Sequence, residues 1–148
     1  MGRVNWNKGK FPRKQQRRSD AETEKFAHAT YFLNGGKEIS YEGEEDILLP
    51  SRKDVATYDL APRMSAEKIA DKAIEQIEKG TNFIFINFAN PHMVGHTAVV
   101  PAIIEAIEEV DRQLKRVVTK LLEKEGTALI TADHGNAAIN IDQVTGKK

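Results

Sequence analysis

Two histidine-containing stretches carry the side chains best suited to metal chemistry. The first places His92 and His96 directly after one apolar run, and the second places Asp133 and His134 after another. Imidazole nitrogens and carboxylate oxygens are common ligands of divalent ions. The sequence has no cysteine, so thiolate ligands and disulfides are excluded. Three histidines and an aspartate at the ends of two apolar runs therefore predict a metal or phosphate site.

Other readings of these residues are weaker. A spacing of four between His92 and His96 is also that of zinc proteases with two histidines on one helix face. However, Pro91 and Gly95 predict a turn or loop here, and no glutamate follows His92, so we reject the protease hypothesis. A Ser–His–Asp triad is not favoured either, because no serine stands in a nucleophile-elbow context.

The elements around these stretches predict an α/β fold. Apolar residues at helical spacing predict helices over residues 65–80 and 101–125, with Ser65 as the cap of the first. The runs at 83–86 and 128–130 do not alternate, which is typical of strands buried in a parallel sheet. We therefore expect a mostly parallel sheet flanked by helices, with the histidines beyond the carboxyl ends of its strands. The stripe expected to be buried on the longer helix is Ile103, Ile107, Val110, Leu114, Val117 and Leu121.

The beginning of the chain differs from the rest. Residues 1–20 are rich in lysine and arginine and form a predicted disordered basic arm, whereas residues 21–148 form the predicted domain. The basic arm suits contact with nucleic acid, but nothing else resembles a nucleic-acid module, so such a partner is not favoured. Within the domain, residues 26–33 and 47–49 are predicted strands.

Bulk properties place few constraints on location. No apolar run approaches the roughly 20 residues that span a bilayer, and the basic start lacks the apolar core of a secretion signal. We therefore expect a cytoplasmic protein without a membrane partner.

Several long motifs resemble one enzyme family, the cofactor-independent phosphoglycerate mutases. The resemblance covers the chain from about residue 21 onward. The matching stretches are residues 21–28, 30–36, 49–51, 55–60, 87–97 and 131–137.

The resemblance implies a partial alkaline-phosphatase-like domain that uses two metal ions, usually manganese. It implies interconversion of 3-phosphoglycerate and 2-phosphoglycerate through a phosphoserine. By motif match, His96 is a ligand of one ion, whereas Asp133 and His134 are ligands of the other. Lys25 matches the lysine that contacts the phosphoryl group, and a lysine suits that role as a point charge.

The sequence departs from the family pattern at functional positions. His92 stands where the family has a metal-ligating aspartate, which tilts the expected metal preference from manganese toward zinc. Ala138 stands where a glutamate is usual. The family's nucleophilic serine, its other metal ligands and its substrate-binding domain match nothing in the 148 residues.

These departures predict that this polypeptide is inactive alone. We expect it to self-associate or to need a complementing N-terminal half. The alternative hypothesis is a catalytically dead metal-binding or partner-binding module with a basic arm.

Overall fold

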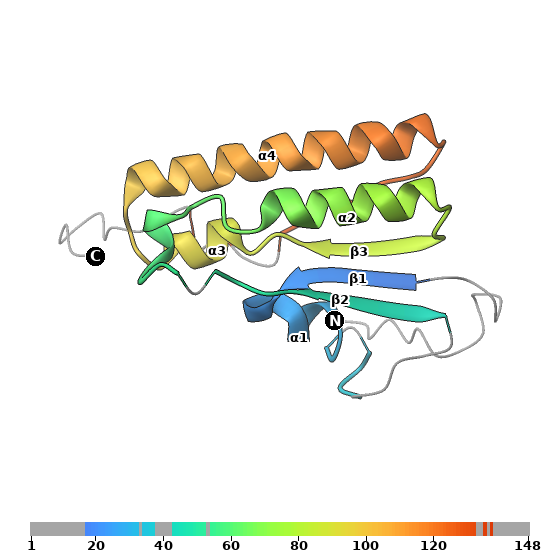
Figure 1. Ribbon diagram of the computed structural model, residues 1–148, viewed down its shortest axis with the longest axis horizontal. Helices are drawn as coiled ribbons and strands as arrows, with labels where there is room; N and C mark the ends of the chain where they lie inside the picture. Colours follow the sequence, from blue (N-terminus) through green and yellow to red (C-terminus); the bar gives the residue numbers. More distant parts are fainter. Residues whose placement is uncertain are drawn as a thin grey trace.

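The computed structural model describes residues 17–32, 34–37, 43–52, 54–132, 135 and 137. Their architecture is a three-stranded parallel sheet in the order β2-β1-β3, accompanied by helices (Figure 1). The elements are β1 (Arg17–Glu22), η1 (Thr23–Lys25), α1 (Phe26–Ala29), β2 (Glu44–Leu49), η2 (Tyr58–Leu60), α2 (Ala66–Glu78), β3 (Phe83–Asn87), α3 (Asn90–Gly95) and α4 (Val100–Glu123). The predicted fold class, a mostly parallel sheet flanked by helices, is confirmed.

The central strand β1 corrects the expected start of the ordered domain. Arg17 pairs with Glu44 of β2 on one side and with Phe83 of β3 on the other, so residues 17–20 belong to the sheet and not to a disordered arm. Backbone groups make these ladders, which is why a strand of charged side chains escaped a search for apolar runs. Residues 1–16 lie outside the described part of the chain.

The strand predicted for residues 26–33 is wrong. The first half of this run forms α1, directly after η1, and a turn follows in which the Asn34 N–H donates to the Thr30 carbonyl at 2.8 Å. A short apolar run does not by itself distinguish strand from helix. The predicted strand at residues 47–49 is confirmed and extends back to Glu44.

Helix α2 lies close to its predicted bounds, although its start is stabilised in another way. Ser65 occupies the N-cap position but its side chain makes no capping hydrogen bond. Instead, the Ser65 backbone N–H donates to the fully buried Glu22 carboxylate on β1. Gly80 ends the helix with φ at +78°, a conformation that costs glycine little. The Ser65 cap was thus predicted at the right residue but with the wrong donor and acceptor.

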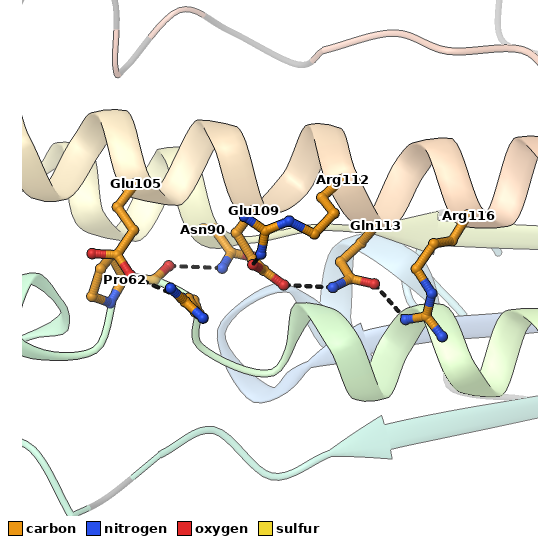
Figure 2. Close-up of polar contacts among 8 residues, drawn as sticks. Pro62, Asn90, Glu105, Glu109, Arg112, Gln113 and Arg116 are labelled. Atoms are coloured by element: carbon orange, nitrogen blue, oxygen red, sulfur yellow. Dashed lines mark hydrogen bonds and ion pairs between the residues drawn. The ribbon is translucent and has the colours of Figure 1, made fainter.

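Helix α4 also lies where predicted, but its buried face differs from the expected stripe. The buried residues are Ala102, Ile103, Ala106, Glu109, Gln113 and Val117. Ile107 is instead 46% exposed. Figure 2 shows how the polar members are accommodated: Gln113 Nε2 donates to Glu109 Oε1 at 2.5 Å, and Arg116 donates to Gln113 Oε1 at 2.6 Å. Hydrogen bonding thus offsets the desolvation of a polar seam between α4 and α2.

Two apolar clusters hold the helices in place. In the first, Ala70, Ala73 and Ile77 of α2 meet Val117 of α4, and Ile86 of β3 packs against them. In the second, Val94 of α3 packs with residues of the first two turns of α4, namely Ala102, Ile103 and Ala106. Helix α4 therefore bridges the sheet layer and α3. Among the described residues, no helix is long and apolar enough to cross a membrane.

Candidate metal centre

His92 and His96 are positioned by α3, which begins three residues beyond β3. The expected turn or loop is wrong: residues 90–95 are helical, with Pro91 in the first turn, where its missing N–H is not needed, and His96 as the C-cap. Residues four apart lie on one face of a helix. The local structure therefore directs both imidazoles to the same side.

The two rings are close enough to act together. His92 Nε2 lies 3.2 Å from His96 Nε2, and the ring centroids are 4.7 Å apart at an interplanar angle of 86°. His92 is half-buried and His96 is exposed, so an ion has access. A nitrogen pair at this spacing can share one proton or one metal ion, because imidazole nitrogens bind metal at about 2.0–2.1 Å. The donor set therefore fits a divalent ion.

Helix α3 is short, but its neighbours fix it firmly. The fully buried Asn90 donates from Nδ2 to the Pro62 carbonyl at 2.9 Å, as Figure 2 shows. Val94 is fully buried in the contact with α4. At the other end, Thr97 Oγ1 donates to the Val94 carbonyl at 2.7 Å. The histidines therefore project from a helix that is anchored at both ends.

Lys25 lies beyond the carboxyl ends of the strands, as the histidines do. It follows β1 by three residues, and Ala21 of β1 is in register with Asn87 of β3, so both strands end at one edge. Figure 1 shows α1 and α3 at the end toward which the strands run. Lys25 is only 4% exposed. Lysine side chains are rarely this buried unless their ammonium group is paired with other polar groups.

Asp133 and His134 lie outside the described residues, so their predicted role is not tested by the geometry. The segment leading to them is described, and it is not the buried strand expected at residues 128–130. It forms no ladder, and Leu129 and Ile130 are 93% and 61% exposed. An apolar run becomes a strand only where another strand pairs with its backbone, and that condition is not visible in local sequence. Within the described ranges, no group of three or more His, Cys, Asp or Glu could hold a metal ion.

Reasoning from sequence missed two buried polar residues of this region. Glu22 anchors the start of α2, and Asn90 anchors the start of α3. Both stand at the ends of elements within the motifs already singled out, which was the available signal. The Glu22 side chain thus ties β1 to α2, and the Asn90 side chain ties the helix that carries His92 to Pro62.

The family of the chain follows from comparison with known proteins. A family model described as the Metalloenzyme superfamily matches residues 10–145. The chain belongs to the Metalloenzyme superfamily. The superfamily's description as metalloenzymes agrees with the use of a divalent metal.

Individual relatives of this chain are phosphoglycerate mutases. The 2,3-bisphosphoglycerate-independent phosphoglycerate mutase of Rhodopseudomonas palustris is 54% identical over 127 residues, covering 85% of this chain and 25% of that protein. Its namesake in Symbiobacterium thermophilum is 57% identical over 127 residues, covering 85% and 24%. The predicted resemblance is confirmed, and the chain spans about a quarter of the length of these relatives.

A solved structure extends the likeness to the fold. Leishmania mexicana phosphoglycerate mutase, crystallised at low cobalt concentration, matches with a TM-score of 0.81 and 34% identity. The match covers 90% of this chain and 25% of that one. The parallel sheet and its helices are therefore those of one part of a phosphoglycerate mutase fold.

Proposed function

We propose that this chain is the part of a phosphoglycerate mutase that binds metal and the phosphoryl group. The complete enzyme would interconvert 3-phosphoglycerate and 2-phosphoglycerate by phosphoryl transfer through a phosphoserine. The observation that carries the proposal is the placement of Lys25 and the His92–His96 pair beyond one edge of the sheet. Over 127 residues, the chain is more than half identical to mutases of two organisms.

Each candidate residue has a distinct role in this proposal. His92 and His96 would hold one ion, and Asp133 and His134 would hold a second. Manganese is the proposed metal, with zinc as the alternative that the histidine at position 92 favours. Such ions neutralise charge on a transferring phosphoryl group. Lys25 binds and orients that group through its fixed positive charge, and its burial keeps competing water away.

The polypeptide of 148 residues alone is proposed to be inactive. A phosphoserine route needs a nucleophilic serine beside the metal site, and we propose no such role for Ser65 or Ser51. Ser65 begins α2, and the Ser51 N–H donates to Thr23 Oγ1 at 3.3 Å. Activity would require the complementing part of a mutase. The complete enzyme is proposed to be a cytoplasmic enzyme of glycolysis.

An apolar surface on α4 supports association with such a partner. Val100, Ile104 and Ile107 recur at helical spacing and are each about half exposed. Contiguous apolar surface of this kind is typical of an interface. Sedimentation should show self-association of the chain alone and a one-to-one complex when the complementing part is added.

A complementation assay tests the function. The chain is mixed with the part of the Rhodopseudomonas palustris mutase that the match does not cover, and 3-phosphoglycerate turnover is followed with manganese or zinc. We expect background rates from each part and a clear rate from the mixture. A rate from the chain alone would refute the predicted inactivity, and a complex without turnover would refute the mutase function.

Lys25 gives the assay a residue-specific control. Lys25→Met should lower the restored rate by about a hundredfold or more, because a fixed positive charge at the phosphoryl group is removed. Lys37→Met changes an exposed lysine and should leave the rate unchanged. Equal rates for the two variants would contradict the role of Lys25.

A further inference from the structure

We propose that His92 and His96 form by themselves a two-nitrogen chelate for a divalent ion that prefers imidazole, such as Zn²⁺, Ni²⁺ or Cu²⁺, over Mn²⁺. The inference deepens the proposed metal role of these residues, but it does not require the chain to take part in catalysis. It depends on the spacing of the two Nε2 atoms, on the rigidity of α3 and on the chemistry of the donors.

The spacing is that of two ligands on one ion. Each imidazole nitrogen lies about 2.0–2.1 Å from a bound zinc, so two such ligands on one ion lie roughly 2.9–3.4 Å apart. The observed Nε2–Nε2 distance of 3.2 Å falls inside that interval. Without metal the same distance suits an N–H···N hydrogen bond, in which one ring donates. An ion would take the place of that proton: each neutral ring would then carry its proton on Nδ1 and direct the lone pair of Nε2 at the ion.

The pair is also formed in advance. Both histidines come from one turn of α3, so no loop closure is needed to bring them together. Asn90 anchors the turn by its hydrogen bond to the Pro62 carbonyl, and Val94 by its packing against α4. Thr97 donates a hydrogen bond to the Val94 carbonyl at the end of the turn. A ligand pair held in the bound geometry loses little conformational freedom on binding. The chelate should therefore work without Asp133 or His134.

The donors set the choice of ion. A neutral imidazole pair suits zinc, nickel and copper, whereas manganese prefers oxygen ligands and stands at the weak end of the affinity order. The resemblance to mutases implies an aspartate at position 92, which would contribute an oxygen and a negative charge. The described residues offer no group of three or more His, Cys, Asp or Glu that could hold a metal ion, so the proposed chelate consists of the two nitrogens.

Metal titration of the full 148-residue chain tests the inference. Binding of Zn²⁺, Ni²⁺, Cu²⁺ and Mn²⁺ is measured by calorimetry, with the visible absorption of bound Cu²⁺ as a direct report on nitrogen ligands. We expect the first three ions to bind at least about tenfold more tightly than Mn²⁺. Equal affinities for Zn²⁺ and Mn²⁺ would overturn the proposal.

Four variants locate the site. His96→Ala and His92→Asp should each weaken Zn²⁺ binding by about tenfold or more, and His92→Asp should narrow the gap to Mn²⁺. His28→Ala is the matched control for histidine number, and it should leave binding unchanged. A double variant, Asp133→Ala with His134→Ala, should retain Zn²⁺ affinity within about threefold. Loss of Zn²⁺ binding in that double variant would overturn the proposal. Unchanged Zn²⁺ binding in His96→Ala would overturn it as well.

Folding and function are separated by two further readouts. Far-ultraviolet circular dichroism of each variant excludes loss of the fold as the cause of lost binding. The complementation assay is independent: zinc binding by the pair without restored turnover refutes the mutase function alone. Restored turnover in a protein with no preference for zinc over manganese refutes the chelate selectivity alone.

Discussion

Strands β1 and β3 are neighbours in one sheet. The more polar strand, β1, is the more deeply buried of the two, although apolar strands are usually the buried ones. β1 carries Ser19, Asp20 and Glu22, all fully buried. β3 is the apolar run from Phe83 to Ile86, and each of its residues is only half-buried. Position in the sheet explains the contrast, because β1 has a strand on each side whereas β3 pairs only with β1 among the described strands. Burial here follows strand order and not hydrophobicity.

The contrast between β1 and β3 predicts which side chains contribute most to the stability of the fold. Hydrogen bonds stabilise buried polar groups, and one carboxylate oxygen of Glu22 accepts such a bond from the Ser65 N–H at the start of α2. An apolar strand with half-exposed side chains removes less surface from water, so each contributes less. A charged residue of β1 should therefore matter more than an apolar residue of β3.

Replacement of Glu22 by alanine should give the largest loss. The substitution removes the acceptor of the buried Ser65 N–H and leaves that donor without its partner, which costs about 2–3 kcal/mol. Urea unfolding of Glu22→Ala measures the cost. Glu67→Ala, which changes an exposed acid in the first turn of α2, is the matched control and should cost less than about 0.5 kcal/mol. Equal midpoints for the two variants would contradict the anchoring role.

A smaller loss is expected on β3. Ile86 packs against the cluster of α2 and α4 but is only partly buried, so Ile86→Ala should cost about 1–2 kcal/mol, below the usual range for a fully buried isoleucine. Ile69→Ala is the reference for a fully buried isoleucine, because Ile69 is fully buried on α2. If Ile86→Ala proved more costly than Glu22→Ala, the proposed ranking of the two strands would be wrong.

The same contrast explains which parts of the fold were predictable from sequence. Helices α2 and α4 and strand β3 show apolar periodicity or an apolar run, and their positions were predicted correctly. β1 was missed because its signal lies in backbone pairing with β2 and β3, which no local pattern reveals. The strand predicted at residues 128–130 was wrong for the opposite reason. Its composition favours a strand, but no described strand pairs with its backbone.

The residues of the candidate site stay predictions, and the geometry of the histidine pair was not predicted from sequence. Spacing and motif picked out Lys25, His92 and His96, and the sheet register places them beyond one edge. Gly95 and Pro91 suggested a loop, yet Asn90 and Val94 hold these residues in a helical turn by tertiary contacts. That turn produces the 3.2 Å nitrogen spacing, which depends on packing against α4 and is not encoded in the spacing of four alone.

The smallest predicted effect concerns a carboxylate at the surface, in contrast to buried Glu22. Lys79 and then Lys72 bond to Glu75 and lower its pKa from 4.5 to about 2. A group whose pKa is lower in the folded state stabilises the fold above its ordinary pKa, and the contribution disappears as the pH falls from about 4.5 toward about 2. Glu75→Gln should therefore match the wild type near pH 2 and be slightly less stable near pH 6.

Asp54 titrates in the same interval, because a hydrogen bond from Arg52 lowers its pKa to about 2. The measurement must therefore be the difference in urea midpoint between wild type and Glu75→Gln, in which the contribution of Asp54 cancels. Since Glu75 is exposed, salt should reduce the difference by screening. A difference that stayed constant from pH 2 to pH 6 would show that the two lysines do not stabilise the folded chain through Glu75. Glu22, in the buried strand, should remain costly to replace at any salt concentration, because burial protects its bond to Ser65 from screening.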